Sequence, residues 1–101
     1  MHVLVDLSVV PLGVGVSVAH YVALCQKVLE EASLTHSVYP AGTLIEGEWD
    51  AVFAAVKRCH LVVHAAGAPR IHTTMRVGTR TDREESGSAR LTSVARAREA
   101  L

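Results

Sequence analysis

The sequence predicts a ferredoxin-like α+β fold, a sandwich in which two helices cover one face of a four-stranded antiparallel sheet. Apolar residues alternate with a period of two in four segments and follow helical spacing in two others. The segments occur in the order strand, helix, strand, strand, helix, strand, which is the split βαβ arrangement. The length of 101 residues suits one domain with a single core.

The first strand and the first helix are predicted over residues 2–10 and about 17–32. One face of the strand is formed by Val3, Val5, Leu7 and Val9. The proline and glycines of residues 11–15 end this alternation, and Ser17 is the expected N-cap of the helix. The apolar positions of the helix are Val18, Val22, Cys25, Val28, Leu29 and Ala32.

A hairpin and a second helix come next. Residues 36–39 and 43–47 are short and β-prone, and the turn at residues 40–42 separates them. The following helix has an apolar stripe made of Trp49, Val52, Phe53, Val56, His60 and Val63. A glycine and a proline within residues 66–69 end this helix, and residues 70–80 alternate again as the last strand.

The C-terminal segment, residues 84–101, is set apart from the predicted domain of residues 1–83. Its first part is polar, and four of its later residues have the spacing of a short helix. These residues are Leu91, Val94, Ala95 and Arg98. We expect this segment to pack on a neighbouring subunit.

Composition and charge exclude several classes of function. The net charge is zero, so there is no basic surplus for nucleic acid, and copies of the chain repel one another weakly. Residues 1–69 carry three basic and six acidic side chains, and residues 70–101 carry seven basic and four acidic ones.

The start lacks a signal peptide and no apolar run could cross a bilayer, so we expect a cytoplasmic protein without membrane contact. Cys25 and Cys59 fit no metal or redox motif and are expected to be reduced, packed thiols.

The sheet face away from the helices is predicted to carry a mixture of polar and apolar residues. By alternation these are Leu4, Asp6, Ser8, Val10, Leu44, Glu46, His72, Thr74 and Arg76. A carboxylate within the extended run around Glu46 needs a partner. One interpretation is contact with a second copy, in which Glu46 or Asp6 pairs with Arg76. The other is a ligand pocket in which Glu46 meets a cation or a donor-rich heterocycle, while Ser8 and Thr43 supply hydrogen bonds.

Catalytic and metal sites receive less support from the sequence. His60 and His64 have the spacing of two ligands on one side of a helix, but His60 belongs to the apolar stripe, so we predict no metal. No serine or cysteine lies in a nucleophile motif, and no cofactor fingerprint is complete. A further hypothesis is an enzyme that acts on a small heterocycle and uses Glu46 with His72 or His64 as acid and base.

Several ordered motifs nevertheless point to a family. They are Leu7-Ser8-Val9-Val10-Pro11-Leu12-Gly13, Tyr39 to Glu48, Val63 to Ile71, and Arg80-Thr81-Asp82. Together they resemble the small thiamine-binding protein family over residues 3 to about 95. The resemblance implies the ferredoxin-like fold, cytoplasmic homo-oligomers that are commonly tetramers built from dimers, and no catalytic activity. It also implies thiamine or its pyrimidine part as the ligand.

The resemblance further implies a set of ligand-binding residues. Those inside matching motifs are Ser8, Gly42, Thr43, Glu46 and Gly47. Glu46 would supply charge opposite to the cationic thiazolium or accept an amino hydrogen, while Ser8 and Thr43 would fix orientation. We add Tyr39, at the end of the hairpin, as a lining residue. The leading hypothesis is therefore a non-enzymatic binding protein that sequesters or senses thiamine, and the alternative is a structural or regulatory homo-oligomer with no pocket.

Overall fold

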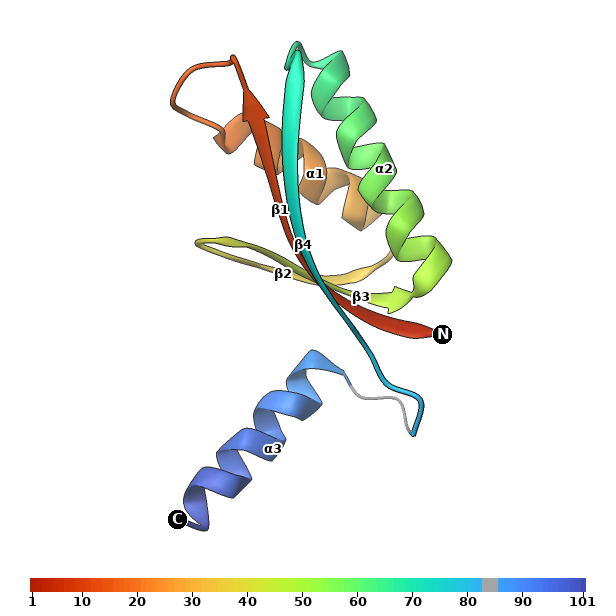
Figure 1. The fold of residues 1–101 in the computed structure, drawn as a ribbon, viewed down its shortest axis with the longest axis vertical. Coiled ribbons are helices and arrows are strands. Elements are labelled where there is room, and N and C mark those ends of the chain that lie inside the picture. The colour runs from red at the N-terminus through yellow and green to blue at the C-terminus, as the bar shows by residue number, and fades with distance from the viewer. Residues whose placement is uncertain (83–85) are drawn as a thin grey trace.

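A computed structural model describes residues 1–82 and 86–101 of the chain (Figure 1). Along the chain the described elements are β1 (His2–Leu12), α1 (Ala19–Glu31), β2 (Thr35–Tyr39), β3 (Gly42–Glu48), α2 (Trp49–Ala65), β4 (Arg70–Thr79) and α3 (Gly87–Glu99). The order of the first six elements is the predicted one. The ferredoxin-like α+β fold is therefore confirmed.

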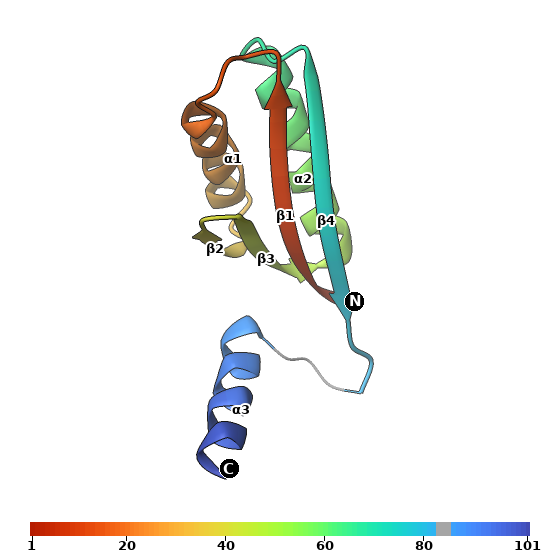
Figure 2. The same ribbon diagram turned by 60° about the vertical axis from the view of Figure 1, so that its left-hand side comes forward.

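The four strands form one antiparallel sheet in the order β2-β3-β1-β4. The central strand β1 is paired unequally with its two neighbours. Its pairing with β3 ends at Leu7, which lies opposite Thr43, whereas its pairing with β4 continues to Leu12. Beyond Leu7, β1 therefore has no strand on its β3 side, and Figure 2 shows its end rising above the hairpin. This difference in length leaves a cavity beside the end of β1.

Helices α1 and α2 cover one face of the sheet and close the core against it. The odd-numbered residues of β1 and β3 face the helices, as the alternation predicted. Fully buried side chains from both layers meet there: Val3, Val5 and Ile45 from the sheet, with Leu29, Val52, Cys59 and Val63 from the helices. Their removal from water is the main stabilisation of the domain.

Two local predictions differ from the structure. Helix α1 begins at Ala19, with Val18 at the N-cap position and no side-chain cap, so the predicted Ser17 cap is wrong. The hydroxyl of Ser17 lies one residue too early to reach the first free amides of the helix. Strand β1 also continues through Pro11. Proline is tolerated there because that part of β1 is an edge on the β3 side and no ladder bond is lost.

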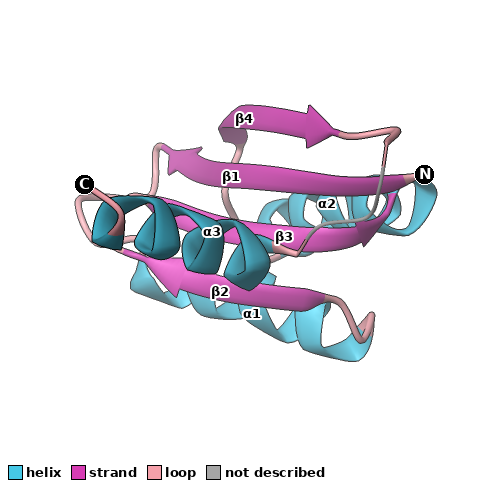
Figure 3. Cartoon of the chain, turned by 90° about the horizontal axis from the view of Figure 1, so that it is seen from below, coloured by secondary structure: helices cyan, strands magenta, loops and turns pink. Residues whose placement is uncertain are grey.

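The predicted terminal helix exists as α3 and stands outside the sandwich (Figures 1 and 3). Ser86 caps it by accepting a hydrogen bond from the amide of Ala89, and none of its residues is buried. The radius of gyration is 15.2 Å, against about 13 Å for a compact domain of this length. The predicted boundary between residues 83 and 84 lies outside the described residues. Within the described part of the chain, no helix is both long and apolar enough to cross a membrane.

Candidate functional site

A cavity of about 170 Å³ opens where β1 runs past the β2–β3 turn. Helix α1 closes it on one side, and the turn at Pro40 and Ala41 closes it on another. Most of the residues that line it are apolar, namely Leu7, Val9, Val10, Val18, Val22, Leu29 and Val38. No lining residue carries a formal charge. The cavity therefore suits a flat, neutral group better than an ion.

The polar groups of the cavity come from three elements. Gln26 of α1 donates a hydrogen bond from Nε2 to Oγ1 of Thr43 in β3, over 3.1 Å. Thr43 is buried, with 7% of its surface exposed. Ser8 also lines the cavity, although its side chain, next to Leu7 in the strand, points to the face opposite Thr43. The β1 backbone beyond Leu7 faces the cavity without a neighbouring strand. Donors and acceptors thus lie close together within apolar walls.

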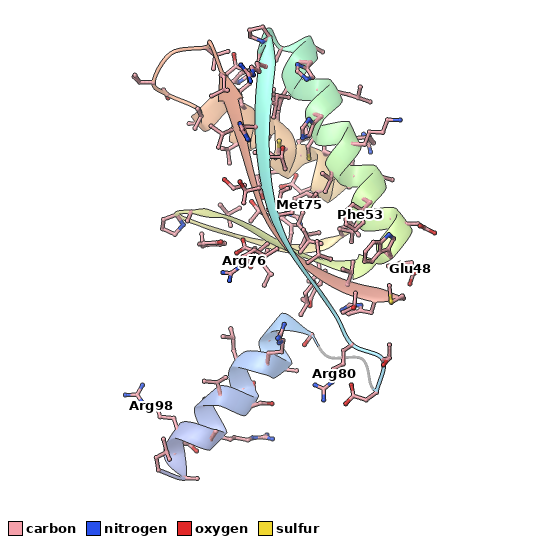
Figure 4. The ribbon with its side chains drawn as sticks, viewed as in Figure 1. Glu48, Phe53, Met75, Arg76, Arg80 and Arg98 are labelled. Carbon is pink, nitrogen blue, oxygen red and sulfur yellow. The ribbon has the colours of Figure 1, made fainter. Side chains whose placement is uncertain are left out.

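Tyr39 and Gly42 form the rim of the cavity at the end of the hairpin, and Tyr39 contacts Asp6, which is not a lining residue. The phenol of Tyr39 donates to Oδ1 of Asp6 over 2.5 Å, across Gly42, with which Tyr39 is paired. This hydrogen bond to a carboxylate raises the pKa of Tyr39 above its ordinary value. Gly42 cannot be larger, because a Cβ there would lie 2.6 Å from the carbonyl oxygen of Leu7. Arg76 leaves β4 on this open side of the sheet (Figure 4).

The structure divides the six predicted site residues between different places. Ser8, Tyr39, Gly42 and Thr43 all line the cavity. Glu46 and Gly47 do not. Thr43 and Glu46 are three residues apart in one strand, so their side chains point to opposite faces of the sheet. The predicted pocket that joined Glu46 to Thr43 is therefore not the arrangement seen here.

Glu46 is instead bound to the first turn of α3. Its Oε2 accepts a hydrogen bond from the amide of Gly87 over 2.7 Å, and it lies 4.0 Å from Nε2 of His2. A carboxylate is stabilised at a helix N-terminus by the helix dipole and the free amides. A second depression of about 290 Å³ surrounds this contact, lined by Thr35, His36, Ser37, Leu44, Glu46, Gly87, Ser88 and Leu91.

Gly47 has a packing role in the helix-facing layer. A Cβ on Gly47 would lie 2.9 Å from Cδ2 of Leu34 and 3.4 Å from Cγ2 of Val52. The absence of a side chain lets β3 approach the segment that follows α1.

Two cavity residues, Gln26 and Cys25, were missed by the sequence analysis. Both come from α1, where the apolar spacing assigned Cys25 to the core and gave Gln26 no role. Gln26 lies four residues after Val22 and three before Leu29, on the inward face of the helix. A polar residue on that face was the available signal.

His60 and His64 serve as local hydrogen-bonding groups. His60 Nε2 lies 2.5 Å from Oγ1 of Thr73, and His64 Nδ1 lies 2.8 Å from the carbonyl oxygen of Ala68. Both contacts join α2 to β4 or to the loop before it. Among the described residues, no three His, Cys, Asp or Glu side chains are grouped to hold a metal.

Comparison with known proteins identifies the family. A family described as "Thiamine-binding protein" matches residues 5–95. The chain belongs to the thiamine-binding protein family. Within this family it is 64% identical to the UPF0045 protein sll0230 of Synechocystis, over 93% of this chain and 78% of that protein. It is 42% identical to the UPF0045 protein ECM15 of Eremothecium gossypii, over 85% and 83%. The resemblance drawn from the motifs is confirmed.

Solved structures of other proteins show the same fold. The hypothetical protein MJ1052 of Methanocaldococcus jannaschii superposes with a TM-score of 0.86 at 28% identity, over 93% of this chain and 96% of that one. A Thermotoga maritima protein, provisionally named for thiamine biosynthesis or salvage, superposes with a TM-score of 0.79 at 16% identity, over 93% and 99%. Neither the family description nor the names of these relatives denote an enzyme class.

Proposed function

We propose that this protein binds thiamine, or a related pyrimidine, in the cavity between β1, the β2–β3 turn and α1, without catalysing a reaction. The observation that carries the proposal is the Gln26–Thr43 pair at the base of an otherwise apolar, uncharged cavity. Membership of a family described as thiamine-binding supports the choice of ligand. The provisional name of the Thermotoga maritima relative is in keeping with it.

The chemistry of the cavity matches the aminopyrimidine half of thiamine. That ring has two flat apolar faces and an edge that carries both an amino donor and ring-nitrogen acceptors. Apolar walls receive the faces, while the carboxamide of Gln26 both donates and accepts at one edge. The hydroxyl of Thr43 and the backbone of β1 beyond Leu7, which has no neighbouring strand on the β3 side, add further donors and acceptors.

The size and charge of the cavity decide which half of thiamine enters. At about 170 Å³ it is smaller than the roughly 300–1,000 Å³ typical of pockets for drug-sized ligands. One ring fits, and the uncharged lining favours the neutral pyrimidine. The cationic thiazolium then lies at the rim, where Tyr39 and the carboxylate of Asp6 meet.

Sequestration or sensing of the ligand in the cytoplasm is the role we propose. We also propose that the protein works as a homo-oligomer, a dimer or tetramer. Helix α3 has 13 residues and none is buried within its own chain, while isolated helices of about 12–15 residues are marginal in water. A second copy would supply the missing contact. In this arrangement Glu46 and Gly47 support the fold and α3, and the cavity residues bind the ligand.

Calorimetric titration with thiamine, hydroxymethylpyrimidine and the thiazole alcohol tests the proposal. We expect saturable binding of thiamine and hydroxymethylpyrimidine, and much weaker binding of the thiazole. Gln26→Leu should weaken thiamine binding by about tenfold or more, because a ligand hydrogen bond is lost within an apolar wall. Glu46→Gln, on the far side of the sheet, is the matched control and should bind as the wild type does.

The alternative, a structural or regulatory homo-oligomer without a pocket, predicts a different result. No ligand would then produce heat, and Glu46→Gln would change subunit association in sedimentation experiments. Loss of affinity in Glu46→Gln with full affinity in Gln26→Leu would move the binding site to the depression under α3.

A further inference from the structure

Cys25 of α1 and Cys59 of α2 meet where the two helices pack together. Both are free thiols, and only 7% and 0% of their surfaces are exposed. Sγ of Cys59 donates to the backbone oxygen of Cys25 over 3.9 Å. A single buried cysteine usually acts as a small apolar residue. Two that meet across a helix contact can also react with each other.

The two thiols have unequal surroundings. The side-chain interaction with Cys59 lowers the pKa of the Cys25 thiol. The same interaction, followed by burial, raises the pKa of Cys59. Because the thiolate is the reactive form, Cys25 is the nucleophile of the pair and Cys59 keeps its proton.

Access to the pair is also unequal. Cys25 lines the cavity next to Gln26, whereas Cys59 is not one of the lining residues. Cys59 lies beneath, within the core formed by the helices and the sheet. A small reagent that enters the cavity therefore reaches Cys25 first.

We propose that Cys25 and Cys59 form a redox-active pair, in which a small peroxide that enters the cavity oxidises Cys25 and Cys59 then closes a disulfide between α1 and α2. In the first step the thiolate of Cys25 attacks one oxygen of hydrogen peroxide. The O–O bond breaks, hydroxide leaves, and a sulfenic acid forms on Cys25. Cys59 gives up its proton as its sulfur attacks that of Cys25, and the S–O bond breaks with release of water. The two thiols supply two electrons and two protons, and the peroxide becomes two waters.

The disulfide has a consequence for the cavity. A disulfide requires the two Cα atoms to lie about 4.4–6.8 Å apart, so the bond fixes α1 on α2. Helix α1 carries Gln26, and oxidation therefore acts on the wall that holds the polar group of the cavity. The redox pair does not depend on which ligand the cavity takes.

Mass spectrometry of the native, full-length protein tests the pair. The reduced protein, freed of reductant, is treated with hydrogen peroxide, and its peptides are mapped without reduction. We expect the loss of two hydrogen atoms from the intact mass and one peptide that links Cys25 to Cys59, both reversed by dithiothreitol. Cys59→Ala should accumulate a sulfenic acid on Cys25, which dimedone captures, and Cys25→Ala should leave Cys59 unmodified.

The wild type supplies a second measurement that needs no variant. Iodoacetamide should label Cys25 about tenfold or more faster than Cys59, because only Cys25 faces the cavity and favours the thiolate. Circular dichroism establishes that each variant is folded. Thiols that react only after denaturation, equal labelling of the two cysteines, or a disulfide that joins two chains would each overturn the proposal.

Discussion

Replacement of Gly42 by alanine is a sharp test of the geometry at the rim of the cavity. Gly42 begins β3 and is paired with Tyr39 at the turn of the hairpin. An added Cβ would lie 2.6 Å from the carbonyl oxygen of Leu7 and 3.4 Å from Oδ1 of Asp6. The first of these atoms belongs to the backbone of β1, which β3 and β4 hold on both sides. It cannot turn away as a flexible side chain would.

The size of the effect follows from these distances. Carbon and carbonyl oxygen in close contact are normally about 3.3–3.6 Å apart, so β3 must move away from β1 by a large part of an ångström. Strain of this kind costs about 1–3 kcal/mol. In a domain of this length each kcal/mol lowers Tm by about 4–8 °C. We therefore expect Gly42→Ala to lower Tm by at least about 4 °C.

Thermal unfolding followed by circular dichroism, at one fixed protein concentration, measures the change. Gly78→Ala is the matched control, because a Cβ on Gly78 in β4 would have Leu4 O, at 3.9 Å, as its nearest neighbour. Alanine is easier to order than glycine in a strand, so the control should be neutral or slightly stabilised. A Gly42→Ala variant as stable as the wild type, or a control destabilised to the same extent, would refute the reasoning.

Three further predictions concern other contacts. The phenol of Tyr39 should titrate above the ordinary range, and Asp6→Asn should lower the pKa of Tyr39, because the carboxylate that stabilises the protonated phenol is gone. Ultraviolet titration measures the pKa in both proteins, and an unchanged pKa in Asp6→Asn would exclude this cause. Glu46→Ala should speed hydrogen exchange in the first turn of α3, because Glu46 accepts a hydrogen bond from the amide of Gly87. Glu48→Ala removes an exposed ion pair instead and should leave this exchange unchanged. Equal exchange in both variants would show that the Glu46 contact does not hold the helix. Leu29→Ala should destabilise the domain by about 2–5 kcal/mol in urea unfolding, because Leu29 is fully buried, and a loss below 1 kcal/mol would contradict the described core.

The sheet and the core could be predicted because alternation has a single physical meaning. Val3, Val5 and Ile45 lie on the apolar side of their strands, and a strand with one apolar face can bury only that face. The length of β1 could not be predicted in the same way. Pro11 signals the end of a strand unless the neighbour on one side is missing, and that depends on where β3 ends.

The candidate site was harder to predict than the fold. Ser8 and Thr43 were expected at the site and both line the cavity, and their role in binding stays a prediction. The expected pocket also joined Thr43 to Glu46, although the two side chains face opposite sides of the sheet. Odd spacing along a strand contains this information. Gln26 comes from a helix distant in sequence from β3, so only the packing of α1 on the sheet brings it to Thr43. The contact of Glu46 with Gly87 likewise depends on the path of the chain to α3.

The central claim is that the pyrimidine ring of thiamine occupies the cavity at the Gln26–Thr43 pair. Nuclear magnetic resonance of the labelled protein, with thiamine added in steps, tests it most directly. We expect saturable shifts of the Gln26 side-chain amide, the Thr43 methyl group and the Gly42 amide, with little change at Gly87. Shifts confined to Gly87 and the residues around Glu46, or no saturable shift anywhere, would contradict the claim.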